Sequence, residues 1–377
     1  MIPFNKRKGG TTASIAYTLC AGLLMSAAGL HADSASNTAA NQQPAYDSDL
    51  FKKDTPAYFI QAEYLCWLVN EGALDYAIKM KHDTWSNLPT TAPVNSYAVG
   101  HFHNAEFDWS SGLRLTFGYF RAPHFWDMFL QYTYLPSYGS NEVRAPNDSD
   151  NDEFLNGTFA EPSIIQNSVA TSLPLERASS RIRLKYHVLD WLASRRFFPN
   201  EHLRLNLFGG VTSAYIYQKW NVYYEDISDQ HAKTRNSWQF EGLGLKLGTK
   251  IDWYLGWDLY LTGLASSGIL SGWYKNTAHE RTQAITANAN QERPVHDTHF
   301  HDSRLAYTAQ FNAGFSWQKA YESVRAEIGV GYEFNIWANL HQIYRSELTL
   351  PTDRKQTIIN DSLLSLQGFT VRANLDF

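Results

Sequence analysis

Charged side chains occur at every second position in several stretches of the sequence, a spacing that places them on one face of a β-strand. The longest such row is Arg181, Arg183, Lys185 and His187. If this face lined a water-filled channel, the row would attract anions, as rings of Arg and Lys do in selective pores. The pattern therefore predicts electrostatic selection among small solutes rather than the breaking of covalent bonds.

The same alternation assigns charged residues of other segments to the face that lines the channel. The basic members are Arg114, Arg204, Lys246, Lys250, Arg304, Arg325 and Arg372, and the acidic members are Asp127, Asp252, Asp258, Glu327, Glu333 and Asp376. Together with the first row, basic groups outnumber acidic ones, which predicts a weak anion preference. A second interpretation stays open, because in a narrow barrel these charges can pair across the lumen and fill it.

Motifs for catalysis or for metal binding are weak or missing. The sequence contains neither Gly-x-Ser-x-Gly nor His-Glu-x-x-His, so no nucleophile is paired with a base by a recognisable motif. His299 and His301, like His101 and His103, could share a Zn or Cu ion. A bare His-x-His pair in a polar stretch is more often solvated, so we expect no metal, no cofactor and no enzymatic activity.

Strict apolar alternation identifies the elements that carry these residues. In residues 304–317 every odd position from Leu305 to Trp317 is apolar, whereas Arg304, Thr308 and Gln310 lie on the other face. Such alternation is typical of a strand with one face in an apolar environment. No helical stripe of comparable length is present, so the fold class is predicted to be all-β.

Short and long connections alternate along the chain, as in an up-and-down antiparallel barrel that crosses a membrane. In bacterial outer-membrane barrels the short turns are periplasmic and the long loops extracellular. The ten predicted strands are 57–80, 97–121, 125–136, 178–194, 202–225, 233–253, 256–277, 297–318, 322–346 and 358–377. Twelve strands would result if 57–80 or 256–277 contained an extra hairpin.

The N-terminal segment and the composition predict export. Residues 1–32 have a basic start and an apolar core ending at Ala32, as in a signal peptide; residues 33–56 are a polar, flexible periplasmic leader, and the barrel is predicted over 57–377. Without residues 1–32 the formal charge is −8, which argues against a nucleic-acid partner. Cys66 is then the single cysteine, so no internal disulfide is expected.

The last strand has a feature of its own. Phe369, Val371, Leu375 and Phe377 alternate with polar residues, and the chain ends on the aromatic ring of Phe377. A terminal aromatic residue that closes an alternating strand looks like the signal by which barrel-assembly machinery inserts outer-membrane barrels. These four residues are the predicted insertion signal.

Six blocks of the sequence carry a family resemblance. They are Phe59–Ala77 (FIQAEYLCWLVNEGALDYA), Trp109–Tyr119 (WSSGLRLTFGY), Trp126–Leu135, Tyr186–Tyr223, Gly329–Trp337 (GVGYEFNIW) and Leu366–Phe377. In this order they resemble the Legionella-type major outer-membrane protein family, which includes the porins of environmental chlamydiae. The resemblance covers nearly all of residues 57–377 and implies a pore-forming outer-membrane barrel. The leader is too short for the coiled coil of some members, and Cys66 alone cannot build a disulfide-linked envelope network.

The expected function is a porin: a passive channel for small hydrophilic solutes in the bacterial outer membrane, weakly anion-preferring. Its expected partners are outer-membrane lipid, the barrel-assembly machinery and the solutes, and self-association into a homo-oligomer stays open. The alternative is a largely plugged structural or adhesive barrel that acts through its extracellular loops, above all the loop 136–177.

Overall fold

The computed structural model describes residues 56–82, 96–121, 126–146, 153–158, 175–200, 202–226, 231–283, 292–321, 324–347 and 356–377. The predicted signal peptide and nearly all of the predicted leader lie outside these residues. In the described parts of the chain, no helix is long and apolar enough to cross a membrane.

Thirteen strands follow one another in the described residues. They are β1 (Pro56–Glu71), β2 (Asp75–His82), β3 (Ser96–Asn104), β4 (Ser110–Arg121), β5 (Trp126–Arg144), β6 (Glu153–Gly157), β7 (Leu175–Asn200), β8 (Leu203–Asp226), β9 (His231–Gly256), β10 (Leu259–Gln283), β11 (Glu292–Ala320), β12 (Arg325–Glu347) and β13 (Gln356–Asp376).

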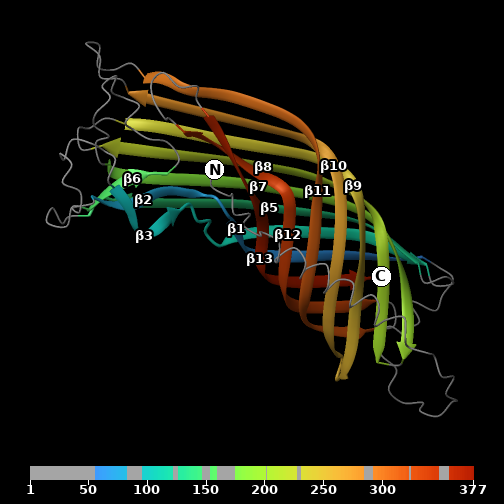
Figure 1. The fold of residues 1–377 in the computed structure, drawn as a ribbon. Helices are drawn as coiled ribbons and strands as arrows, with labels where there is room; N and C mark the ends of the chain where they lie inside the picture. Colours follow the sequence, from blue (N-terminus) through green and yellow to red (C-terminus); the bar gives the residue numbers. More distant parts are fainter. Residues whose placement is uncertain are drawn as a thin grey trace, which may run out of the picture. The chain divides into compact units, whose positions relative to one another are not determined.

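Ten of these strands close into a ring in which each strand is antiparallel to both neighbours (Figure 1). Around the ring the order is β1, β4, β5, β7, β8, β9, β10, β11, β12 and β13. The ring closes because β1 pairs with β13, with Phe59 opposite Asp376 and Glu71 opposite Leu364. The predicted all-β, up-and-down barrel with about ten strands is confirmed.

The other three strands, β2, β3 and β6, add a small sheet to the ring. β2 pairs with both β3 and β6, and β6 joins the ring through Leu155, which lies opposite Leu175 of β7. The prediction of single strands over 57–80 and 97–121 is therefore wrong. The first breaks after Glu71, where Ala73 adopts the left-handed backbone conformation of a turn. We call the described residues 72–82 and 96–109 the β1–β4 insert.

The two ends of the barrel differ in their connections. Short turns join β4 to β5, β7 to β8, β9 to β10 and β11 to β12, and Tyr58 exchanges backbone hydrogen bonds with Phe377 at the same end. We call this the short-turn end and the opposite one the long-loop end. Strands run further toward the long-loop end than predicted, since β5 continues to Arg144. Pairing between neighbouring strands satisfies the backbone hydrogen-bonding groups there just as it does in the membrane. Part of the predicted loop 136–177 is therefore strand, and the loop is shorter than predicted.

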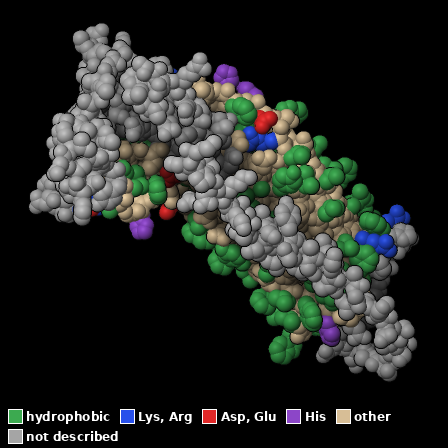
Figure 2. All heavy atoms as spheres, viewed as in Figure 1, with side chains coloured by type: hydrophobic (Ala, Val, Ile, Leu, Met, Phe, Trp, Pro, Cys, Tyr) green, Lys and Arg blue, Asp and Glu red, His purple; other side chains and the backbone are tan. Residues whose placement is uncertain are grey.

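An apolar belt covers the outside of the barrel toward the short-turn end (Figure 2). On β9 the outward residues change from Gln239 and Glu241 to Leu243, Leu245 and Leu247, the last three 61–68% exposed. So large an exposed apolar surface is stable only against lipid. The belt includes the outward side chains Phe369, Val371, Leu375 and Phe377 of β13, whose part in membrane insertion stays a prediction.

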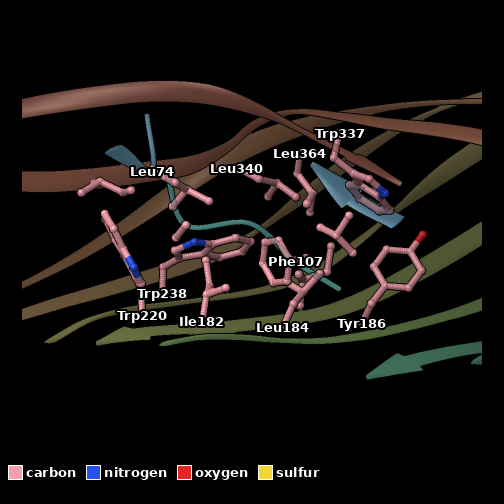
Figure 3. Packing of buried hydrophobic residues seen from close by; sticks show 14 of the residues in the cluster. Leu74, Phe107, Ile182, Leu184, Tyr186, Trp220, Trp238, Trp337, Leu340 and Leu364 are labelled. Carbon is pink, nitrogen blue, oxygen red and sulfur yellow. The ribbon is translucent and has the colours of Figure 1, made fainter. Parts of the chain in front are cut away.

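Toward the long-loop end the barrel has the opposite arrangement, with its apolar side chains inside. Figure 3 shows this core, in which Trp220, Trp238 and Trp337 come from the barrel wall and Leu74 and Phe107 from the β1–β4 insert. The insert lies inside the barrel, since the inward Tyr224 hydroxyl donates to the backbone carbonyl of Tyr76 over 2.6 Å. Water surrounds this half, so burying the rings inside is the favourable arrangement.

Candidate functional site in the lumen

The structure turns most of the predicted lumen residues inward. Arg114, Arg204, Lys246, Lys250, Arg304, Arg325, Glu327, Glu333 and Arg372 all point into the barrel, and most of them are nearly inaccessible to solvent. Their inward orientation follows from the belt, because successive side chains of a strand point to opposite faces. Where every second residue contacts lipid, the residues between them must face the lumen. Whether these residues line a conducting pore is a separate question.

The predicted inward orientation of Arg181, Arg183, Lys185 and His187 is wrong. On β7 the apolar belt residues are Leu189 and Trp191, which are odd-numbered, so every odd residue of this strand points outward. The inward neighbours are Ile182, Leu184, Tyr186 and Val188, which belong to the apolar core. His187 lies at the edge of the belt and the other three lie beyond it. Outside the hydrocarbon of the membrane the surroundings are polar, so the rule that apolar residues face outward no longer holds.

Three buried lumen residues were missed by sequence reasoning. Glu63 on β1, Asp190 on β7 and Arg196 on β7 face inward and are 2–9% exposed. The sequence did contain a signal for two of them. Asp190 and Arg196 are even-numbered, whereas the outward Trp191 is odd-numbered, so strand alternation turns both of them inward. Arg196 was assigned to a turn because the strand was ended too early.

Arg114 forms the centre of a charged network that crosses the lumen. Its guanidinium donates to Glu63 of β1 over 2.7 Å and, in a two-point contact of 2.7 and 2.9 Å, to Glu333 of β12. Glu333 also accepts hydrogen bonds from the amides of Gln310 and Asn335 at 2.8 Å. Such charge-assisted, two-point pairs are strong and hold both partners in place. The network therefore joins strands that do not pair with each other.

A second set of ion pairs lies nearer the short-turn end. Its members are Arg196–Asp127, Arg325–Asp376 and Arg372–Glu327 at 2.7 Å, Lys246–Asp190 at 2.9 Å, and the close Arg204–Asp252 pair.

The charges that face the lumen at the level of the belt are balanced. Among the described residues, seven of them are basic and seven are acidic. The basic set is Arg114, Arg196, Arg204, Lys246, Lys250, Arg325 and Arg372, and the acidic set is Glu63, Asp127, Asp190, Asp252, Glu327, Glu333 and Asp376. The predicted excess of basic groups is absent from this lining, because the four β7 residues face outward, Arg304 lies outside the lining, and Glu63 and Asp190 add acidic groups.

Among these charges lies a cavity of about 140 Å³. Most of the residues that line it are polar, among them Arg114, Lys250, Asn312 and Glu327, and aromatic side chains such as Phe59 and Phe129 complete the wall. Above it the lumen narrows to a space of about 20 Å³ bordered by Tyr186 and Trp337. We call these two residues the neck.

At the neck, rings from opposite sides of the barrel meet. Tyr186 of β7 and Trp337 of β12 stack edge to face, with their ring centroids 6.0 Å apart. The apolar core continues from the neck toward the long-loop end, so the polar cavity is separated there from the outside. In chemical terms the site is a charge-balanced chamber below an apolar barrier.

Metal binding finds no support in the described residues. They contain no group of three or more His, Cys, Asp or Glu side chains placed to hold an ion. His299 and His301 face each other with ring centroids 6.0 Å apart on the exposed part of β11. Cys66 is a free thiol.

A buried carboxyl lies beyond the belt, in the core at the long-loop end. The Glu71 side chain is fully buried, and His341 Nδ1 lies 3.3 Å from its carboxyl group. Burial raises the pKa of Glu71 to about 8, and a hydrogen bond with Gln218 opposes part of this rise. Glu71 therefore holds a proton in the folded barrel at pH 7.

This proton predicts a pH-dependent stability. The folded barrel keeps the proton up to about pH 8, whereas the unfolded chain loses it near the ordinary pKa of 4.5. Stability is therefore expected to fall, by about 1.4 kcal/mol per pH unit at most, as the pH rises from about 5 to about 8. Glu71→Gln should remove this slope. Thermal midpoints at five pH values would show it, and parallel curves for wild type and variant would contradict the assignment.

Comparisons with known proteins complete the description of the site. A family model for the Legionella pneumophila major outer membrane protein precursor matches residues 53–377. No curated protein resembles the chain closely enough to count as a relative.

Some solved structures match the chain weakly. The outer membrane protease OmpT from Escherichia coli has a TM-score of 0.36 and 10% identity, and the match covers 87% of this chain and 99% of that one. A FadL homologue of Pseudomonas aeruginosa has a TM-score of 0.27 and 9% identity, covering 89% and 92%. The P. putida toluene transporter TodX has a TM-score of 0.24 and 10% identity, covering 89% and 91%. These scores are too low to bear on what the present chain does.

Proposed function

The chain belongs to the Legionella major outer membrane protein family, and from this premise we propose that it forms a passive channel for small hydrophilic solutes. Membership in this family and the lipid-facing belt support a location in the bacterial outer membrane. The short-turn end is then periplasmic and the long-loop end extracellular. No catalytic step and no cofactor are part of the proposal.

One observation carries the channel proposal. The membrane-level lumen holds a polar cavity, and the barrier above it includes the β1–β4 insert, which is not part of the barrel wall. A displacement of the neck and of the insert would connect the cavity with the outside while the ring of strands stays closed. The channel is therefore proposed to have a closed state, held by the neck.

Charge selection is expected to be weak. The balanced lining attracts neither sign, because each basic group on it is offset by a neighbouring carboxylate. Lumen width and the barrier would then decide which solutes pass. This replaces the anion preference that followed from the β7 row.

A second candidate function has an observation of its own. The apolar core fills the barrel toward the long-loop end, as expected of a structural or adhesive barrel that acts through its extracellular loops. In that case the ion pairs of the lumen would serve only to satisfy buried charges.

Single-channel recording distinguishes the two candidates. Residues 33–377, refolded and added to a planar bilayer, are expected to give discrete but infrequent steps, with a reversal potential near zero in a KCl gradient. Shifted mobility on unheated gels would establish that the barrel is folded. Complete silence of a folded barrel would reject the channel and favour the structural or adhesive role.

A further inference from the structure

The outer surface just beyond the belt is charged on one side of the barrel. On β7 to β10, the belt ends at a row made of His187, Tyr215, Glu241 and Trp273, which lie opposite one another in register. The next outward residues toward the long-loop end form three further rows across the same four strands. Because these rows follow directly on the apolar belt, we place them at the level of the lipid headgroups.

Six exposed or half-exposed cations lie in these rows. They are Arg181, Arg183 and Lys185 on β7, Lys219 on β8, Arg235 on β9 and Lys275 on β10. Arg183 lies opposite Lys219, and Arg181 lies opposite Asn221, which in turn faces Arg235. Paired strands are about 4.8 Å apart, and alternate residues of one strand about 7 Å. The six side chains therefore form one continuous surface, which we call the basic patch.

The basic patch lacks the counter-charges that accompany the cations of the lumen. Among the described residues, none of the six has a carboxylate within the 4.0 Å of an ion pair, whereas Arg177 farther along β7 pairs with Glu225 at 2.7 Å. Arg183 lies over the ring of Tyr138, 5.0 Å from its centroid, so its guanidinium is held in place without being neutralised. Six like charges on neighbouring strands repel one another, and a bound anion would remove this cost.

The described outward residues of β11, β13, β1 and β5 do not repeat the pattern. On β11, β13, β1 and β5 the described outward residues at the corresponding level include no Lys or Arg. They are uncharged, as are Ser303, Gln367, Asn70 and Tyr138, or histidine, or acidic in the case of Asp297 on β11. A general preference for anionic membranes would distribute cations around the whole barrel. Their confinement to four adjacent strands indicates a bound molecule with several anionic groups.

We infer that the basic patch binds a phosphate-bearing glycolipid of the outer leaflet. Its acyl chains would lie against the belt residues Leu189, Leu243 and Trp273, and its phosphates would contact Arg181, Arg183, Lys185 and Lys219. Arg binds phosphate through two parallel hydrogen bonds and Lys through its charge. This inference is independent of conduction through the lumen.

Lipid retention tests the inference. The refolded barrel is incubated with mixed micelles that contain diphosphoryl lipid A, purified, and analysed for bound lipid phosphate. The variant is Arg181→Gln/Arg183→Gln/Lys185→Gln, three exposed positions at which the fold is expected to tolerate Gln. The matched control is Arg121→Gln/Arg195→Gln/Lys319→Gln, which removes three exposed cations near the short-turn end.

Wild type and control are expected to retain lipid A, and the patch variant to bind it at least tenfold more weakly. Dephosphorylated lipid A should be retained by none of the three. Equal retention by the patch variant, or an equal loss in the control, would overturn the inference. Preferential binding of soluble polyglutamate over lipid A would also overturn it and indicate an acidic protein partner. Unchanged channel recordings of the patch variant would show that lipid binding at the basic patch and conduction through the lumen are independent.

Discussion

Replacing Trp337 by alanine is expected to raise the single-channel conductance severalfold and to make open events frequent. The Trp337 ring is 2% exposed, and it meets Tyr186 across the lumen, directly above the polar cavity. Removing it would widen the neck and leave a gap between the cavity and the apolar core packed beyond it. Because a Trp-to-Ala change in a core costs about 3–5 kcal/mol, gel mobility must first show that the barrel is folded.

A matched control separates opening of the neck from general loosening. Trp191 lies on β7 with its ring 61% exposed to the lipid side, so Trp191→Ala removes the same atoms without touching the lumen. Its conductance should equal that of the wild type. Trp337→Leu, which keeps more of the core volume, is expected to give an intermediate conductance. If folded Trp337→Ala conducts no better than Trp191→Ala, the neck is not the barrier.

The second large effect is expected from Arg114. Arg114→Met would leave the carboxylates of Glu63 and Glu333 buried beside each other, with side chains 7% and 1% exposed. Removal of one partner from a buried ion pair costs about 3–5 kcal/mol, since the remaining charge is neither paired nor solvated. The free energy of unfolding, measured by urea titration in lipid vesicles with Trp fluorescence, should fall by this amount.

The double variant Arg114→Met/Glu333→Gln tests the cause of the loss. It removes one of the two uncompensated charges and should recover at least about 1 kcal/mol of the stability. Arg195→Met is the control, because this arginine is exposed on the outside of β7 and should matter by less than about 0.5 kcal/mol. A loss below about 1 kcal/mol for Arg114→Met would mean that the network contributes little to the barrel.

The sequence by itself determined the class of fold and much of the membrane-spanning wall. Alternation in Leu305–Trp317 and in Phe369–Phe377 identified strands with one lipid-facing side, and the structure places both in the belt. This was predictable because the strand period is local and lipid imposes one rule on every strand it contacts. The inward orientation of Arg114, Glu327 and Glu333 followed from the same rule.

Two features of the fold could not be predicted from the rule that the apolar face of a strand contacts lipid. On β7 the residues from Arg181 to His187 keep the parity of Leu189, but they lie at or beyond the edge of the belt, where the surroundings are polar rather than hydrocarbon. A polar outward face and an apolar inward face are then favourable. Alternation alone does not distinguish such a segment from one within the belt, where the apolar face is outward. The β1–β4 insert was hidden for a similar reason, since β2 and β3 alternate like the strands that they follow and precede.

Only the tertiary structure decided which charges meet and whether the lumen is open. Arg114 and Glu333 are separated by 219 residues, and their contact depends on the closure of the whole ring. The neck likewise depends on β7 and β12 facing each other across a barrel narrow enough for two rings to touch. Strand alternation is a property of neighbouring residues, whereas pairing and closure across a lumen depend on strand number and register, which arise only when the barrel closes.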